Sequence, residues 1–121
     1  MIGIGVDLVE VDRIRTVLAR TPSMVSRMFT EAERAYADGA RDPAERYAVR
    51  FAAKEAVLKA LGVGLGAVDW HDIEVLRTDG GAPKLHVTGR AQALAVQAGV
   101  TEWKLTMTHT RTLAEAIAVA L

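Results

Sequence analysis

Hydrophobic and polar residues alternate with changing period along the chain, and each change of period marks a predicted element. The opening run IGIGV indicates a short buried strand that ends at Asp7. Four hydrophobic residues then recur at helical spacing: Val11, Ile14, Val17 and Leu18. Thr21-Pro22 closes this helix, so the chain is predicted to begin with a strand that leads into an amphipathic helix.

Two helix-start signals divide the polar stretch that follows. Thr30 and Glu33 have the spacing of a capping box, which predicts a short helix. Asp42-Pro43 is a second start, because aspartate can cap a helix, proline fits its first turn, and Glu45 could reach back. The long helix that begins there is predicted to run to Leu61, before a glycine that can end it.

The second half of the chain first alternates as strands do and then returns to a helical period. DIEVLR and KLHVT flank the glycine turn TDGGAP, which predicts a β-hairpin. The next segment, GRAQALAVQAGV, is predicted to be a helix that ends at its last glycine.

The last two segments, EWKLTMTHT and LAEAIAVAL, are predicted to be strands. Alanine favours a helix in the second of them, but its alternation and its position after a strand favour a strand. Together the patterns predict one compact α+β domain over residues 1–121, in the order strand, three helices, hairpin, helix and two strands.

Composition limits the classes of function. The 121 residues balance 15 basic against 15 acidic side chains, which argues against a general nucleic-acid or membrane binder. The absence of cysteine excludes a disulfide framework and a zinc–thiolate site. The apolar start lacks a basic leader, and no apolar run approaches the roughly 20 residues that span a bilayer. We therefore expect a cytoplasmic protein.

Three patterns resemble functional motifs and fail on inspection. GIGVDL begins like a dinucleotide-binding motif, but leucine replaces its third glycine and too little chain precedes it. GVGLG lacks the Lys-Ser/Thr of a phosphate-binding loop and follows a helix instead of preceding one. The three histidines have no metal-ligand spacing.

The long helix carries charges within RFAAKEAVLKALG, although alanine and leucine dominate it. Glu55 and Lys59 share one face as an i,i+4 pair, acid first, an arrangement that stabilises exposed helices by about 0.2–0.5 kcal/mol. That is the simplest interpretation of the pair. Small residues cover most of the circumference, however, which predicts a helix packed on several sides, where charges need partners.

Asp7, at the end of the first strand, is a second possible partner for Glu55. Two carboxylates brought together repel unless a cation lies between them, and a few oxygen ligands suit Mg²⁺, which also binds phosphate oxygens. Arg50, Lys54 and Lys59 on the same helix would then suit the rest of a polyphosphate. The alternative for Asp7 is a simple cap on the next helix.

Four segments together resemble the holo-acyl-carrier-protein synthase family, the small phosphopantetheinyl transferases. They are GIGVDLVEVDRI, RFAAKEAVLKALG, GGAPKL and MTHT, and they occur in the family's order over the whole chain. The resemblance implies transfer of 4′-phosphopantetheine from coenzyme A to a serine of an apo acyl carrier protein, leaving adenosine 3′,5′-bisphosphate. It also implies a homotrimer in which each active site lies between two subunits.

For the reaction, the resemblance implies that Asp7 and Glu55 bind Mg²⁺ and that Lys59 contacts the pyrophosphate. The carrier serine would attack the β-phosphorus of coenzyme A, while Mg²⁺ and Lys59 stabilise charge on the pyrophosphate as the bridging oxygen leaves. Two candidates stay open for the general base, namely a water on the metal and Glu55.

For the substrates, the resemblance implies that Lys54 is another phosphate contact and that Arg50 and His109 lie near the 3′-phosphate. Glycine-rich loops would line coenzyme A with Gly62, Gly64, Gly81 and Pro83. Arg13 would meet acidic residues of the carrier protein. Ala82 departs from the family, because many members carry Lys or Arg there, so one nucleotide contact would be missing.

Two other functions fit parts of this pattern. A non-enzymatic module that binds coenzyme A or a nucleotide would keep the basic residues but would not need both Asp7 and Glu55. A purely structural oligomer would use the charges as salt bridges between subunits. Fatty acid biosynthesis and polyketide synthesis both stay open as the pathway that the carrier protein serves.

Overall fold

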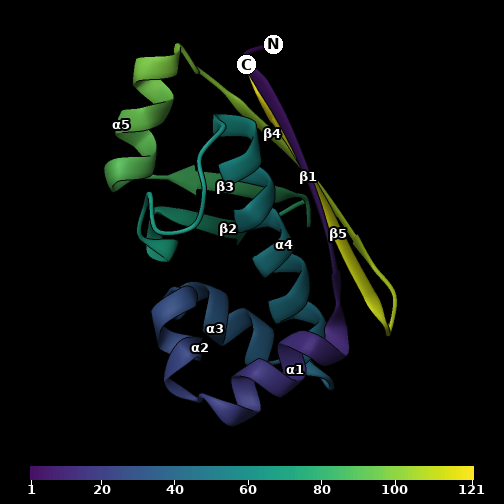
Figure 1. The fold of residues 1–121 in the computed structure, drawn as a ribbon. Helices are drawn as coiled ribbons and strands as arrows, with labels where there is room; N and C mark the ends of the chain where they lie inside the picture. Colours follow the sequence, from purple (N-terminus) through teal and green to yellow (C-terminus); the bar gives the residue numbers. More distant parts are fainter.

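A three-stranded antiparallel sheet with the strand order β1-β5-β4 supports the fold in this computed structural model, which describes residues 1–121. Its strands are β1 (Gly3–Glu10), β4 (Trp103–His109) and β5 (Leu113–Ala120). The first and last strands pair along their whole length, so that the two chain termini lie together at one end of the molecule (Figure 1).

Four helices connect β1 to the second sheet: α1 (Val11–Arg20), α2 (Ser23–Met28), α3 (Glu31–Asp38) and α4 (Pro43–Leu61). The second sheet is the hairpin of β2 (Ile73–Arg77) and β3 (Pro83–Val87), and α5 (Gly89–Ala98) leads from it to β4. Figure 1 shows α4 lying along the three-stranded sheet, with α1, α2 and α3 grouped near its first turns. None of these helices has the length and hydrophobicity needed to cross a membrane.

The predicted α+β fold is confirmed, with one α-helix more than the sequence predicted and a one-turn 3-10 helix, η1 (Trp70–Asp72), before the hairpin. Three helices were expected between the first strand and the hairpin, but Ser23–Met28 forms the additional α2 directly after Thr21-Pro22. Six residues make fewer than two helical turns, which is too short for a hydrophobic period to show. The final segment is the strand β5, as its alternation predicted.

Both predicted helix starts are confirmed, but their predicted side-chain caps have different outcomes. At α3 the capping box forms, because the Thr30 hydroxyl accepts from the Glu33 backbone N–H at 3.3 Å and the Glu33 carboxylate accepts from the Thr30 N–H at 2.9 Å. The helix α4 begins at Pro43 and ends at Leu61 before Gly62, as predicted, but Asp42 at its N-cap makes no side-chain capping hydrogen bond and forms no box with Glu45. Asp42 instead accepts two hydrogen bonds from Arg15, at 2.6 and 3.0 Å.

Two glycines of β1 allow α4 to lie directly on the strand. A Cβ added to Gly3 would fall 2.0 Å from the carbonyl oxygen of Ala60, and one added to Gly5 would fall 1.9 Å from that of Ala56. No side chain fits at either position, so the GIG motif serves close packing of the two backbones. Fully or almost fully buried alanines complete this contact: Ala52, Ala56, Ala114, Ala116 and Ala118.

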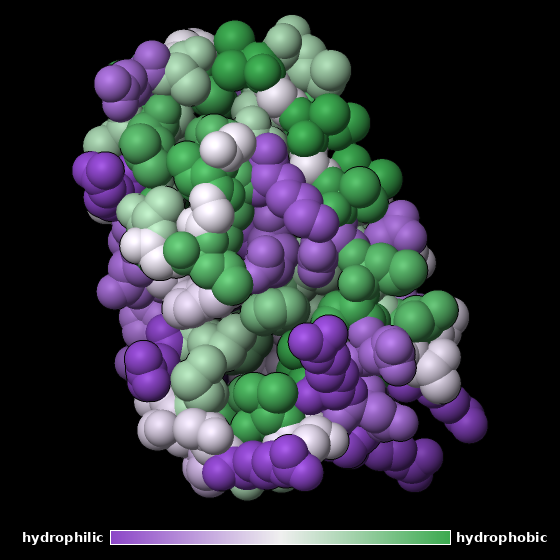
Figure 2. All heavy atoms as spheres, in the orientation of Figure 1, coloured by the Kyte–Doolittle hydropathy of each residue, from purple (hydrophilic) through white to green (hydrophobic).

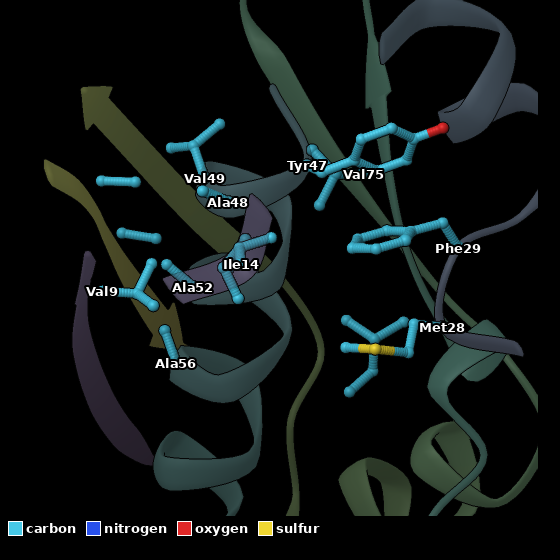
Figure 3. Packing of buried hydrophobic residues seen from close by; sticks show 14 of the residues in the cluster. Val9, Ile14, Met28, Phe29, Tyr47, Ala48, Val49, Ala52, Ala56 and Val75 are labelled. Atoms are coloured by element: carbon cyan, nitrogen blue, oxygen red, sulfur yellow. The ribbon is translucent and has the colours of Figure 1, made fainter. Parts of the chain in front are cut away.

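Larger side chains fill the space between α4 and the first three helices. Figure 3 shows Phe29 facing Tyr47, with Met28 and Ile14 nearby. The two ring centroids are 4.8 Å apart, and all four side chains are buried. This packing fixes the position of α4 between the sheet and the helices, and with it the positions of the charged side chains of α4.

Candidate active site

The crossing of α4 over β1 brings Asp7 and Glu55 to one pocket of about 340 Å³, most of whose other lining is apolar. Burial raises the pKa of the Glu55 carboxyl, and the negative charge of Asp7 raises it further. The two acids therefore lie close enough to repel. A cation between them would relieve that repulsion.

Lys59 supplies a positive charge beside the two acids. Its ammonium donates to the Asp7 carboxylate at 3.1 Å and to the carbonyl oxygen of Val6 at 2.9 Å. The predicted helical pair between Glu55 and Lys59 is therefore wrong, because the crossing strand offers the ammonium a nearer acid. The charge of Lys59 still opposes the rise in the pKa of Glu55. With its side chain 53% exposed, Lys59 can also reach a ligand.

The donor set around Asp7 and Glu55 fits a magnesium ion. Mg²⁺ in proteins is commonly held by one or two carboxylates, while waters and phosphate oxygens fill its other positions. No group of three or more acidic, histidine or cysteine side chains in the structure is placed so that it could hold a metal ion. The two carboxylates therefore match a site in which water and phosphate oxygens supply the other ligands.

Lys54 lies in the core and not in the site. Its ammonium donates to the Glu33 carboxylate at 2.8 Å, to the Trp70 carbonyl at 3.1 Å and to the Ile73 carbonyl. The Lys54 and Glu33 side chains are both 0% exposed. The prediction that Lys54 contacts a phosphate is therefore wrong, because its three donors are used inside the protein. Burial lowers the pKa of Lys54, and the charge of Glu33 opposes that change.

Lys54→Met is expected to destabilise the fold, because it leaves the Glu33 carboxylate buried without its cation. Breaking one side of a buried ion pair typically costs about 3–5 kcal/mol. Urea denaturation of both proteins measures the loss. The double variant Glu33→Gln/Lys54→Met removes both charges and should recover part of it. A Lys54→Met protein as stable as the wild type would contradict this structural role.

A second and larger pocket, of about 840 Å³, gathers six arginines: Arg15, Arg41, Arg46, Arg50, Arg77 and Arg111. Four residues predicted to bind coenzyme A also line it, namely Arg50, Gly81, Pro83 and His109. This pocket shares no lining residue with the pocket of Asp7 and Glu55. Most of the predicted site residues thus lie in two separate pockets of the same chain.

Arg50 is the most deeply buried arginine of the larger pocket. Its side chain is among the largest that are fully buried, yet Nε and Nη2 have no hydrogen-bond partner. Nη1 donates only to the carbonyl oxygen of Arg46, at 3.4 Å. Burial lowers the pKa of the Arg50 guanidinium. Because buried donors without partners are costly, such an arginine is typical of a site that binds an anion.

The remaining predicted residues lie at the surface. Gly62 and Gly64 follow α4 in an exposed loop, where an added Cβ would meet no heavy atom within 4 Å. Arg13 is exposed on α1 and lines the pocket that also contains Asp7 and Glu55. The structure therefore places Arg13 beside the carboxylates and leaves open space around the glycine loop.

Among the residues of the larger pocket that were not predicted from the sequence are Tyr36 on α3, Arg46 on α4 and Arg77 on β2. The two guanidinium carbons lie 3.9 and 5.1 Å from the centre of the Tyr36 ring. The only signal for them was the density of arginines near the start of α4, because no sequence spacing links three separate elements.

Relatives of known type match the chain over almost all of its length. Residues 3–118 match the family model described as the 4′-phosphopantetheinyl transferase superfamily. A holo-[acyl-carrier-protein] synthase of Frankia casuarinae is 47% identical over 120 residues, which cover 99% of this chain and 97% of the relative. That of Moorella thermoacetica is 42% identical over 119 residues, which cover 98% and 93%.

Solved structures agree with this relationship. The holo-[acyl-carrier-protein] synthase of Neisseria meningitidis has a TM-score of 0.90 at 29% identity and covers 100% of this chain and 98% of its own. That of Bacillus anthracis, in complex with coenzyme A (3′,5′-ADP), has a TM-score of 0.81 at 35% identity and covers 98% and 95%. These likenesses confirm the fold and the transferase class that the sequence predicted. The chain belongs to the 4′-phosphopantetheinyl transferase superfamily.

Proposed function

We propose that this protein transfers 4′-phosphopantetheine from coenzyme A to a serine hydroxyl of an apo acyl carrier protein and releases adenosine 3′,5′-bisphosphate. The observation that carries this proposal is the meeting of Asp7, Glu55 and Lys59 where α4 crosses β1. Relatives that are 42% and 47% identical and bear the name of this activity support it. The cytoplasmic location and the service to fatty acid biosynthesis are part of the same proposal.

Each site residue has a distinct task in this reaction. Asp7 and Glu55 hold Mg²⁺, which when bound supplies positive charge that stabilises the pyrophosphate as it develops negative charge. Lys59 turns its exposed ammonium from Asp7 towards the pyrophosphate oxygens. Arg50 and His109 bind the 3′-phosphate in the larger pocket. The serine oxygen bonds to the β-phosphorus and gives its proton to a general base, for which Glu55 and a water are the two candidates. The bond from that phosphorus to the bridging oxygen breaks, and the bridging oxygen leaves with its electron pair as part of adenosine 3′,5′-bisphosphate.

An active site shared between two subunits would unite the two groups of residues. One chain places Asp7 and Glu55 in one pocket and Arg50 and His109 in another, with no lining residue in common. In a homotrimer, the Arg50 pocket of one subunit can face the Asp7 pocket of the next. This arrangement gives every site a metal end and a nucleotide end.

The outer face of the three-stranded sheet offers a surface for this assembly. Every second residue of β1 points away from α4, and four large apolar side chains in or just before this strand are at least 50% exposed: Ile2, Ile4, Val6 and Leu8. The register places Ile117 and Val119 of β5 beside them. Figure 2 shows hydrophobic side chains along the side of the molecule where β1 lies. So large an apolar face is typical of a protein–protein interface.

A mass measurement tests the proposed transfer. Incubation with coenzyme A, Mg²⁺ and an apo carrier protein should add the mass of one phosphopantetheine to the carrier. A protein that binds coenzyme A without this mass gain would instead be a binding module.

Light scattering tests the proposed homotrimer, which should have three times the chain mass of 13.0 kDa.

Arg13→Glu is expected to weaken docking of the carrier protein and to leave the affinity for coenzyme A close to that of the wild type. Arg13 is exposed beside the carboxylates, and exposed charges are screened over about 8–10 Å at moderate salt. The KM for the carrier should therefore rise, and salt should raise the wild-type KM as well. Steady-state kinetics with each substrate varied in turn separates the two effects.

A matched control for this prediction is Arg90→Glu, the same charge change on α5 outside both pockets. It should leave the KM for the carrier near the wild-type value. An equal loss of affinity for coenzyme A in Arg13→Glu would show that Arg13 belongs to the nucleotide site instead.

A further inference from the structure

Three arginine side chains surround the ring of Tyr36 in the larger pocket. The guanidinium carbons of Arg46, Arg50 and Arg77 lie 3.9, 4.5 and 5.1 Å from the ring centre. Tyr36 belongs to α3, two of the arginines to α4, and the third to the end of β2. All four line the same pocket, so one ring joins three elements of the fold at this site.

None of these three arginines has a carboxylate partner among the ion pairs of the structure. Three like charges around one ring repel. Burial lowers the pKa of Arg50 most, and the charges of Arg77 and Arg46 lower it further. Cation–π attraction to the Tyr36 ring opposes this repulsion. The charge of Glu33 raises the pKa of Arg50 in the opposite direction, but no acid forms an ion pair with any of the three arginines, so their positive charge is available to an anion.

Two of the arginines are fixed in complementary ways. The Arg46 Nη1 donates to the carbonyl oxygen of Tyr36 at 2.6 Å, so this guanidinium is held by both the ring and the backbone of the same residue. Arg50 is 2% exposed and keeps Nε and Nη2 unpaired. Nitrogens of one guanidinium can bind two oxygens of a phosphate at once, which gives the cluster a geometric preference for that group.

We propose that Tyr36 is a positioning residue that holds Arg46, Arg50 and Arg77 as one phosphate-binding cluster, and that it thereby sets a preference for coenzyme A over 3′-dephospho-coenzyme A. This inference rests on the proposed function, which brings the 3′-phosphate to Arg50. Tyr36 acts through the arginines and lies outside the pocket of the acids that hold the metal. Its influence is therefore on binding of the 3′-phosphate and not on the transfer step.

Two substitutions of Tyr36 test this inference. Tyr36→Leu removes the aromatic ring and keeps a good helix former, whereas Tyr36→Phe keeps the ring and removes only the hydroxyl. In Tyr36→Leu the KM for coenzyme A should rise by about tenfold, the scale of losing cation–π contacts to partly desolvated guanidinium groups. The KM for 3′-dephospho-coenzyme A and the kcat should change far less. Tyr36→Phe should keep the wild-type preference.

Calorimetry gives the same comparison without turnover. Tyr36→Leu should weaken binding of adenosine 3′,5′-bisphosphate much more than binding of AMP, which lacks the 3′-phosphate. If Tyr36→Leu lowers the thermal midpoint, Arg77→Gln provides a second test, because Arg77 is exposed on another element. It should reduce the preference for the 3′-phosphate in the same direction.

Equal losses with both coenzyme forms in Tyr36→Leu, or a Tyr36→Phe protein as impaired as Tyr36→Leu, would overturn the role of Tyr36. A wild-type protein that transfers phosphopantetheine equally well from both forms would also overturn it and would leave the proposed function intact. A wild type that shows no transfer would overturn the proposed function. The calorimetric comparison would then test separately whether the arginine cluster binds the 3′-phosphate.

Discussion

Asp7→Ala and Glu55→Ala are each expected to remove most of the transfer activity, and the double variant should be no worse than either. If both carboxylates hold one metal ion, the loss of one disrupts the whole site, and residues that act as a unit give non-additive effects. Transfer rates measured over a range of Mg²⁺ concentrations check this, because each variant should lose its dependence on the metal.

Lys59→Met should lower turnover by about 10²–10³, the usual effect of one preorganised electrostatic contact.

A stability measurement separates loss of the metal site from misfolding. Mg²⁺ should raise the thermal midpoint of the wild type and not that of Glu55→Ala, since a ligand stabilises only the fold that binds it. Glu31→Ala removes an exposed acid of α3 outside both pockets and serves as the control, which should keep its response to Mg²⁺. A folded Glu55→Ala protein with near-normal turnover would exclude the metal site.

Ile4→Asp is expected to split the proposed trimer into monomers and to remove activity, although it changes no residue of the candidate active site. Ile4 is 57% exposed on the outer face of the sheet, so the change should spare the fold of one chain. At an interface, however, it would bury a carboxylate without a partner, which costs several kcal/mol. Sedimentation should give the mass of one 13.0 kDa chain.

The control for Ile4→Asp is Val96→Asp, which places the same charge at an exposed apolar position of α5. It should leave the trimer and its activity intact. Mixing provides a second measurement, since Glu55→Ala and Arg50→Ala subunits, each inactive alone, should regain part of the activity when they assemble together. A fully active monomer would contradict both the trimer and the shared site.

The sequence revealed elements with a clear period and missed those without one. The 19 residues of α4 and the alternation in β5 were long enough to read, whereas the six residues of α2 were not. Helical geometry also placed Lys54 beside the polar face of α4. Its true surroundings come from Glu33, 21 residues away, and from the backbone before β2, and only the packing of the whole chain brings these together.

The same limit applies to the candidate site. The pairing of Asp7 with Glu55 was predicted from their residue types and from the family resemblance, and the structure does bring the two residues to one pocket. The partner of Lys59 could not be predicted from helical spacing, which compares residues one turn apart, because Asp7 is 52 residues away in the sequence. Arg46 and Arg77 were missed for the same reason, since they and Tyr36 come from three separate elements.

The glycines at Gly3 and Gly5 bear on how accurately the catalytic groups are spaced. Because no side chain separates β1 from α4, the distance between Asp7 and Glu55 is set by two main chains in direct contact. Packed side chains can absorb a small displacement by changing rotamer, but touching backbones have no such freedom. The spacing of the two proposed metal ligands thus depends on two residues that have no side chain and take no part in the proposed chemistry.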